Sequence, residues 1–299
     1  MPRHRKEADA AKAAPMTAQL PLWRACQRWR DRRDSYRPAG EPLEPARYEV
    51  APIPDDTTAR AFVTQHHYSG TYPAARRRFG LYRGSALVGV AVYSQPWAHV
   101  ARGAFPAGVR PGEVAELSRF VLLDRVPANG ETWFLARTFA ALRAEDFAGV
   151  LSFCDPAPRR TAAGALVFPG HIGTIYQAHN AVYLGRGRAR TIRLLPDGAV
   201  LSDRILTKIR RGECGWRYGV ERLVAAGAPP PADDRDLRGW LRRALECVTR
   251  TMRHPGNHRY VWGLDRAMRR LLPGGAAYPK PSVCGCRCFE CVSAEGGDR

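Results

Sequence analysis

The fold is decided by residues 116–156, which read ELSRFVLLDRVPANGETWFLARTFAALRAEDFAGVLSFCDP. Residues 116–123 alternate with the period of two that is typical of a β-strand. Residues 130–145 place apolar side chains at helical spacing, and they follow an asparagine suited to cap a helix. The apolar run at residues 150–154 predicts a buried strand. A strand, a helix and a second strand in this order indicate an α/β fold, with a sheet covered by helices.

The segments on both sides extend this pattern. Residues 48–53 predict a first strand, and residues 57–65 predict a short helix. Two further strands, 79–83 and 86–93, flank a Gly-Ser turn and predict a hairpin. Another short helix is expected at residues 174–181. We therefore predict a mixed α/β (α+β) twisted sheet flanked by helices.

The chain divides into four predicted parts. A basic flexible arm spans residues 1–46, and the α/β core spans residues 47–195. A basic helical extension follows at residues 196–275, with a cysteine-rich flexible tail at 276–299. The helices expected in the extension are 203–211, 216–226 and 237–253, with a last short element within 260–270.

The net charge of the chain indicates which class of molecule it binds. Its 299 residues include 47 Lys and Arg against 28 Asp and Glu, a formal net charge of +19. Such an excess favours a polyanion as partner, above all DNA; a coding preference for Arg is the competing explanation. No run approaches the roughly 20 apolar residues of a membrane span, and no signal-peptide core is present. We therefore expect a cytoplasmic protein without a membrane partner.

The cysteines gather at the C-terminal end. Four of the eight lie in the tail: Cys284, Cys286, Cys288, Cys291. Their spacing matches no standard zinc finger, so a soft-metal site and an adventitious tail are both open. A disulfide framework is not expected in a reducing compartment.

Several positions are suited to chemistry. The side chains of Glu116 and Ser118 share one face of their strand, and the alternation adds Phe120 and Leu122 to that face. Asp155 follows the end of a buried strand, where it either faces a ligand crevice or caps the next turn. The start of the helix at residues 130–145 is an anion site in principle. Tyr176 would share a helix face with Asn180, although core packing is the competing interpretation.

Four motifs taken together resemble one family. They are His67-Tyr68-Ser69, Glu116-Leu117-Ser118-Arg119, Asp155-Pro156 and Ile175-Tyr176-Gln177-Ala178. In this order they resemble the phage Mom DNA-modification proteins, a divergent branch of the GNAT acyltransferase superfamily. The resemblance covers about residues 48–195, and residues 204–262 look like the C-terminal part of such proteins.

The resemblance implies an enzyme that installs a carbamoylmethyl or related group on the N6 amine of adenine in DNA, which protects phage DNA from restriction. It implies catalytic roles for five residues: His67, Tyr68, Ser118, Asp155, Tyr176. It also implies a bound iron, and acetyl-CoA or another acyl donor. The donor would contact the turn and helix start at Asn129, Gly130, Glu131 and Thr132. Asp155 and His67 are both candidates for the general base.

Basic residues are expected to contact DNA. The expected set is Arg119, Arg159, Arg160, Lys208, Arg210, Arg211 and Arg259. The two helices at 203–211 and 216–226 flank a glycine-containing turn, which is compatible with a helix-turn-helix, and contact with phosphates is favoured over base reading. A solvated basic face is the alternative. A homodimer is also compatible with the sequence.

Two other functions remain open. The first is a GNAT acyltransferase that acts on a protein or small-molecule amine. The second is a DNA-binding accessory protein whose acyltransferase-like core does not catalyse a reaction.

Overall fold

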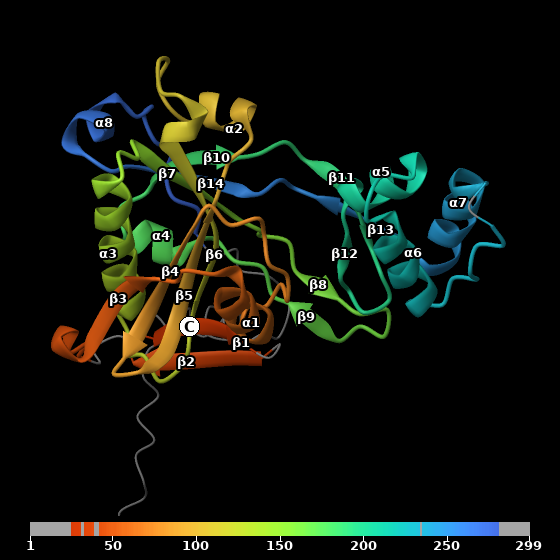
Figure 1. The fold of residues 1–299 in the computed structure, drawn as a ribbon, viewed down its shortest axis with the longest axis horizontal. Coiled ribbons are helices and arrows are strands. Elements are labelled where there is room, and N and C mark those ends of the chain that lie inside the picture. The colour runs from red at the N-terminus through yellow and green to blue at the C-terminus, as the bar shows by residue number, and fades with distance from the viewer. Residues whose placement is uncertain (1–24, 31–32, 39–41, 234, 281–299) are drawn as a thin grey trace, which may run out of the picture.

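The computed structural model describes residues 25–30, 33–38, 42–233 and 235–280. Its main sheet has seven strands in the order β10-β14-β7-β6-β5-β4-β3 (Figure 1). Their bounds are β3 Tyr48–Pro52, β4 Arg77–Arg83, β5 Ala86–Ser94, β6 Val114–Leu122, β7 Gly149–Cys154, β10 Val182–Arg186 and β14 His258–Gly263. Only β6 and β7 pair in parallel, and every other neighbouring pair in this sheet is antiparallel. The mixed sheet confirms the predicted fold class.

Helices cover both faces of this sheet. The helices of the core are α1 Asp56–His66, α2 Ala98–Arg102, α3 Gly130–Ala144, α4 Thr174–Ala178 and α8 Arg266–Leu271. On one face, α3 and α4 enclose the largest apolar cluster, which includes Phe134 and Leu142. On the other face, α1 packs Phe62 and Val63 against Val90 and Val92 of β5. Adjacent residues of β5 belong to different clusters, as the alternation of a strand requires.

The predicted β-α-β unit forms, with one local change. In the pairing of β5 with β6, Val92 lies opposite Arg119 while Tyr93 lies opposite Leu117, so Ser118 is an extra residue in a β-bulge. The bulge shifts the alternation, and Leu117 joins Phe120 in the cluster under α3. The prediction that Phe120 and Leu122 share a face with Glu116 and Ser118 was therefore wrong.

The extension has a helical core of its own beside the sheet (Figure 1). It contains α5 Asp203–Arg211, α6 Trp216–Ala225 and α7 Leu237–Val248, and a small sheet of β11 Arg190–Leu194, β12 Val200–Leu201 and β13 Arg250–His254 joins it to the core. α5 and α6 pack so closely that a Cβ added at Gly219 would lie 2.6 Å from Ile205.

The C-terminal part differs from the prediction. The helix expected at residues 237–253 ends at Val248, and residues 250–254 form β13, which pairs with β11. The chain then returns as β14, which lies between β10 and β7. The sequence analysis ended the core at residue 195, whereas the main sheet includes residues 258–263.

Two short pairs of strands lie outside the sheets described above. Within the predicted N-terminal arm, β1 Ala25–Arg30 and β2 Arg33–Pro38 pair as an antiparallel hairpin. β8 Arg159–Arg160 and β9 Leu166–Phe168 form a second, short pair. The cysteine-rich tail from Cys284 to Cys291 lies outside the described residues. None of the described helices is long and apolar enough to cross a membrane.

Candidate active site

The candidate site lies where two neighbouring strands separate. β6 and β7 pair only through Val114–Glu116 and Gly149–Leu151. Both strands continue past this point, β6 to Leu122 and β7 to Cys154. The carboxyl end of β7 therefore presents Asp155 beside an opening in the sheet. α/β proteins commonly hold ligands at such a place.

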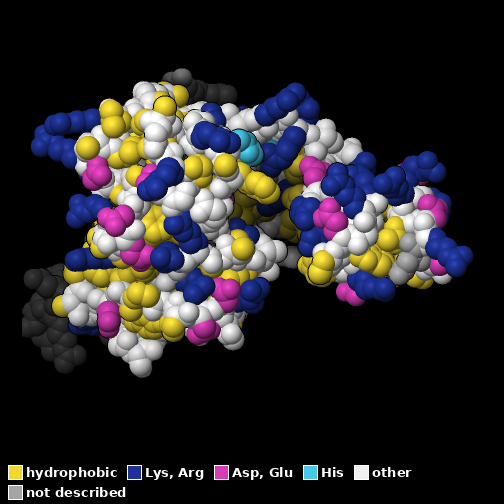
Figure 2. Space-filling model, turned by 45° about the horizontal axis from the view of Figure 1, so that its top comes forward, with side chains coloured by type: hydrophobic (Ala, Val, Ile, Leu, Met, Phe, Trp, Pro, Cys, Tyr) yellow, Lys and Arg dark blue, Asp and Glu magenta, His cyan; other side chains and the backbone are white. Residues whose placement is uncertain are grey.

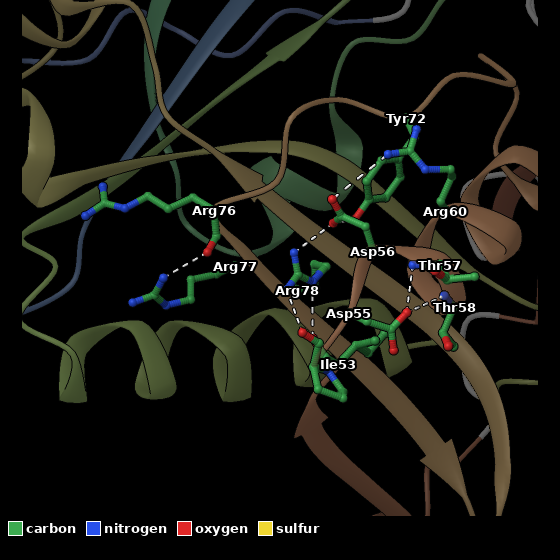
Figure 3. A network of polar contacts seen from close by, with 11 residues as sticks. Ile53, Asp55, Asp56, Thr57, Thr58, Arg60, Tyr72, Arg76, Arg77 and Arg78 are labelled. Carbon is green, nitrogen blue, oxygen red and sulfur yellow. Dashed lines mark hydrogen bonds and ion pairs between the residues drawn. The ribbon is translucent and has the colours of Figure 1, made fainter.

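The loop after α1 carries two predicted catalytic residues, His67 and Tyr68. A polar network closes this loop, as Figure 3 shows. Asp56, in the first turn of α1, accepts hydrogen bonds from the Tyr72 hydroxyl at 2.9 Å and from Arg78 of β4 at 2.7 Å. The network ties residue 72 to the start of α1 and to the sheet, and so fixes both ends of the segment.

His67 is held as a neutral imidazole. The Ser69 backbone N–H donates to its Nδ1 at 3.2 Å, and the Ser69 hydroxyl lies 2.9 Å from the same nitrogen. Burial lowers the pKa of His67 well below its ordinary value, and the nearby Arg119 and His171 add to this effect. With Nδ1 accepting, the proton lies on Nε2. His67 thus offers an N–H donor, which favours Asp155 as the general base.

Tyr68 lies in a stack of rings. Its ring stacks on Phe168 with centroids 4.7 Å apart and lies 4.2 Å from the ring of His67. The Arg159 guanidinium covers Phe168 at 4.3 Å. Burial, with a smaller contribution from Cys154, raises the pKa of Tyr68 to about 12. Tyr68 therefore keeps its proton at neutral pH and can donate it in a hydrogen bond.

Asp155 is fixed by three partners. Its Oδ1 accepts from the Ala157 backbone N–H at 2.9 Å and lies 2.8 Å from His254 Nε2. Its Oδ2 forms an ion pair with Arg159 at 3.2 Å. The side chain is still 20% exposed. Asp155 therefore caps the turn after β7 and also remains within reach of a substrate, so the two interpretations of the sequence are compatible.

His254 lies at the site, although it is not among the site residues predicted from the sequence. Its side chain is 1% exposed, at the end of β13. The Gly256 backbone N–H donates to Nδ1 at 3.1 Å, so Nδ1 carries no proton. The proton of the neutral ring then lies on Nε2, which donates it to Asp155. His254 thus orients the carboxylate.

Ser118 and Arg119 lie at the bulge of β6. The Ser118 hydroxyl donates to the Glu116 carboxylate at 3.3 Å, which confirms that these two side chains point the same way. Burial raises the pKa of Glu116. The Arg119 guanidinium donates to the carbonyl and the hydroxyl of Thr71, at 2.9 and 2.8 Å. Arg119 therefore supports the loop of His67 and Tyr68.

Tyr176 lies one layer deeper than the other candidates. Its side chain is buried on α4, and its hydroxyl is 3.0 Å from Ser152 Oγ. Ser152 donates to the Leu117 carbonyl at 2.9 Å, and because a serine has one proton, Tyr176 then donates to Ser152. Burial raises the pKa of Tyr176 well above its ordinary value, and Tyr68 contributes. The Tyr176 hydroxyl is thus bonded to Ser152 and not to Asp155.

The helix expected around Tyr176 is also shorter than predicted. α4 ends at Ala178, and Asn180 follows it in the left-handed region with a φ of 56°. Asn180 therefore does not share a helix face with Tyr176. The chain must turn here to enter β10.

The residues predicted to bind a cofactor lie at the start of α3. Asn129 occupies the N-cap position with a φ of 71°, but its side chain makes no capping bond. Gly130 packs against Val126, because a Cβ there would lie 2.5 Å from that side chain. Glu131 is buried in the first turn, and the Thr132 hydroxyl donates to the Asn129 carbonyl at 3.2 Å. A buried acidic residue and a packing glycine do not fit a pyrophosphate cradle, and cofactor contact here stays a prediction.

The basic residues predicted to bind DNA divide into two groups. Arg119 and Arg159 form contacts within the site. Arg119 donates a hydrogen bond to Thr71, and Arg159 pairs with Asp155 and covers the ring of Phe168. The other five reach the surface in whole or in part: Arg160, Lys208, Arg210, Arg211, Arg259. Their contact with DNA stays a prediction.

The donors of the site do not fit an iron centre. No group of three His, Cys, Asp or Glu side chains within the described part of the chain is placed to hold a metal ion. Both ring nitrogens of His254 already form hydrogen bonds, and the Asp155 oxygens are engaged by His254 and Arg159. No catalytic step is therefore assigned to a metal.

His171 is a second residue missed from the sequence. Its backbone N–H donates to the Asp155 carbonyl at 2.8 Å, and its Nε2 lies 3.4 Å from the Tyr68 hydroxyl. Burial lowers the pKa of His171 to about 4. Its only signal in the sequence is its place between Gly170 and Gly173, in a loop rich in proline, arginine and glycine. Both glycines have positive φ and approach backbone or side-chain atoms closely.

Comparisons with known proteins show the family of the chain. The sequence profile of the Mom protein family matches residues 47–280. No curated protein matches the chain. Among solved structures, a tandem GNAT protein from the clavulanic acid biosynthesis pathway, determined without AcCoA, is similar with a TM-score of 0.38 and 10% sequence identity. The likeness covers 73% of this chain and 99% of that chain. Because the family profile spans most of its length, the chain belongs to the Mom protein family.

Proposed function

We propose that this protein is a DNA-modifying transferase that attaches a carbamoylmethyl or related group to the exocyclic N6 amine of adenine. Membership of the Mom family supports DNA modification and group transfer. The formal net charge of +19 supports a polyanionic substrate. Such a modification shields phage DNA from restriction nucleases.

One observation carries the proposal. The Asp155 carboxylate, held by His254 and Arg159, lies at the opening between β6 and β7, and its charge is one of the smaller causes that raise the pKa of Tyr68. The N6 amine of adenine is a weak nucleophile because its lone pair is delocalised into the ring. A carboxylate base and a fixed hydrogen-bond donor are the groups that such a reaction needs.

The side chains divide the work as follows. Asp155 accepts the proton that N6 loses as the new N–C bond forms and the leaving group departs from the donor. His254 and Arg159 hold the carboxylate in place. Tyr68 and the Nε2–H of His67 donate hydrogen bonds to the substrate or the leaving group. An adenine in duplex DNA must be turned out of the stack to reach them.

The test replaces Asp155 by asparagine. Its amide oxygen keeps the bonds from Ala157 and His254, while the base and the charge facing Arg159 are lost. Nucleosides from plasmid DNA of expressing cells are then analysed by mass spectrometry. The wild type is expected to yield a modified deoxyadenosine, and Asp155→Asn is expected to yield none while DNA affinity and melting temperature stay close to those of the wild type.

Asp197→Asn is the matched control. Asp197 is exposed and accepts the Ala199 backbone N–H at 2.8 Å, the same turn geometry as Asp155 with Ala157. This control should leave modification unchanged. Full modification by Asp155→Asn contradicts the base assignment. Unmodified DNA with the wild type, despite salt-sensitive DNA binding, favours the accessory-protein alternative, and acylation of a protein or small amine favours the acyltransferase alternative.

A further inference from the structure

A second hollow lies on the other face of the sheet from α3 and Tyr176. A cavity of about 770 Å³ opens between α2, the β7-β14-β10 part of the sheet and the connection from β10 to β11. Its apolar floor includes Leu151, Phe153 and Val261, which belong to the cluster opposite the one under α3. Figure 2 shows the surface hollowed between the core and the helical extension, with hydrophobic side chains in the hollow and Lys and Arg side chains around it.

The rim of this hollow is cationic. The connection from β10 to β11 reads Arg186-Gly187-Arg188-Ala189-Arg190, and the three arginines are exposed. Arg188 and Arg190 line the cavity together with Arg259 of β14. Among the described residues, no acidic side chain lines the cavity and none forms an ion pair with Arg188 or Arg190. Arginines that are not neutralised within the protein favour an anionic occupant.

Two further observations point to a ligand. Arg259 donates through Nη2 to the Leu184 carbonyl at 2.7 Å, but its buried Nε has no hydrogen-bond partner among the residues that the structure describes. A buried N–H without a partner is costly, so a bound acceptor would stabilise it. Trp97, at the N-cap of α2, is 75% exposed, and His99 in the same helix lines the cavity. Trp97 is thus two residues along the chain from a residue that lines the cavity, and exposed aromatic side chains are typical of surfaces that stack nucleobases.

We propose that this hollow is the DNA groove of the protein: Arg188 and Arg190 bind phosphates, and Trp97 stacks on a base or sugar. The inference rests on the proposed function, because that function supplies DNA as the polyanion. The inference adds a route for the bound DNA. The DNA would lie on the face of β7 opposite Tyr176 and would extend to the end of β7 that carries Asp155. Arg259, predicted from the sequence to contact DNA, lies in this path.

The test measures the affinity of the full-length protein for a fluorescent 30-base-pair duplex between 0.05 and 0.4 M NaCl. The variant is Arg188→Gln/Arg190→Gln, because both side chains are exposed and their loss should not disturb the core. Each phosphate contact contributes about 0.9 to the slope of log K against log salt. The double variant should therefore lower the slope by about 1.8, and at 0.15 M salt the affinity should fall about thirtyfold.

The control is Arg83→Gln/Arg143→Gln, which removes the same charge from exposed positions away from the hollow. This control variant should change the salt slope by less than about half of the change expected for Arg188→Gln/Arg190→Gln. Trp97→Ala should lower the affinity at least about fivefold with an unchanged slope, because stacking releases no counterions. Equal slopes for the Arg188→Gln/Arg190→Gln variant and the wild type overturn the groove. In that case a small organic anion, tested with 2′-deoxyadenosine 5′-monophosphate as probe, becomes its candidate occupant.

The two proposals can fail separately. Binding is measured without any reaction, so a shifted slope supports the groove even where no modified nucleoside is found. Conversely, a modified nucleoside together with an unchanged slope keeps the proposed function and rejects the groove.

Discussion

Replacing His254 tests whether it orients Asp155 or only fills space. Each ring nitrogen of His254 has one partner: Nδ1 accepts from Gly256, and Nε2 donates to Asp155. The amide of asparagine can occupy the place of Nδ1, and the amide of glutamine can occupy the place of Nε2. His254→Asn therefore keeps the bond to Gly256 and loses the bond to Asp155, whereas His254→Gln does the reverse.

The two variants should cost similar stability but different activity. Each loses one buried hydrogen bond, which costs about 1 to 3 kcal/mol, so both should melt at a lower temperature than the wild type. Only His254→Asn leaves the Asp155 carboxylate without its donor. Misplacement of a catalytic group by about 1 Å can cost about a hundredfold in rate. We expect a 10- to 100-fold slower modification for His254→Asn and less than about a fivefold loss for His254→Gln.

The assay combines thermal unfolding with the time course of deoxyadenosine modification in expressing cells, corrected for the amount of folded protein. In buffered lysates of the same cells, the pH profile of the rate should also shift for His254→Asn and stay in place for His254→Gln, because only the first changes the surroundings of the base. Equal rates for the two variants would mean that His254 has a structural role alone, and the positioning argument would fail.

Further predictions concern other parts of the molecule. Because burial lowers the pKa of His171 to about 4, the unfolded chain takes up this proton at a higher pH than the folded protein does. The free energy of unfolding should therefore be highest above pH 6.5 and should decrease by about 3 kcal/mol as the pH falls to 4. Urea unfolding across this pH range should show a smaller decrease for His171→Asn than for the wild type. Tyr176→Phe should cost about 1 kcal/mol through the bond to Ser152, and a loss of modification far beyond the loss of folded protein would assign its hydroxyl to the chemistry. Lys208→Gln/Arg210→Gln should lower the salt slope of DNA binding by about 1.8 if both side chains of α5 contact phosphates; no change would favour a solvated basic face. Gly219→Val should destabilise the extension by about 1 to 3 kcal/mol, because its Cβ would meet Ile205, and circular dichroism melting should detect the change.

Strong local patterns allowed much of the core to be predicted. The strand, helix and strand between residues 114 and 154 occur as expected, because their periods are clear in the local sequence. The bulge at Ser118 was not predictable, since it depends on the register with β5, which no local pattern encodes. Of the site residues predicted from the sequence, the structure has Asp155 and Tyr68 at the candidate site and Tyr176 in the layer beneath it.

The helical spacing of apolar residues continues past the end of α7. Leu241, Leu245, Val248 and Met252 continue the spacing of a buried stripe, so a helix to residue 253 was the natural prediction. The structure ends the helix at Val248, and Thr249 is extended. Residues 250–254 instead find five partners along β11. Tertiary pairing therefore decides this segment, as it often does where β-branched residues are present.

This local change determines the site. Because β13 is a strand, the chain reaches the turn before β14 at the end of the sheet where β7 stops, and His254 lies against Asp155. The pairing of β7 with β6 ends at Leu151. The pairing of β7 with β14 continues to Cys154, which lies opposite His258. The position of the carboxylate therefore depends on a strand about 100 residues away in sequence. Substitutions that loosen β14 should reduce modification before they unfold α1 or α3, because among the described strands only β14 pairs with the last residues of β7 before Asp155.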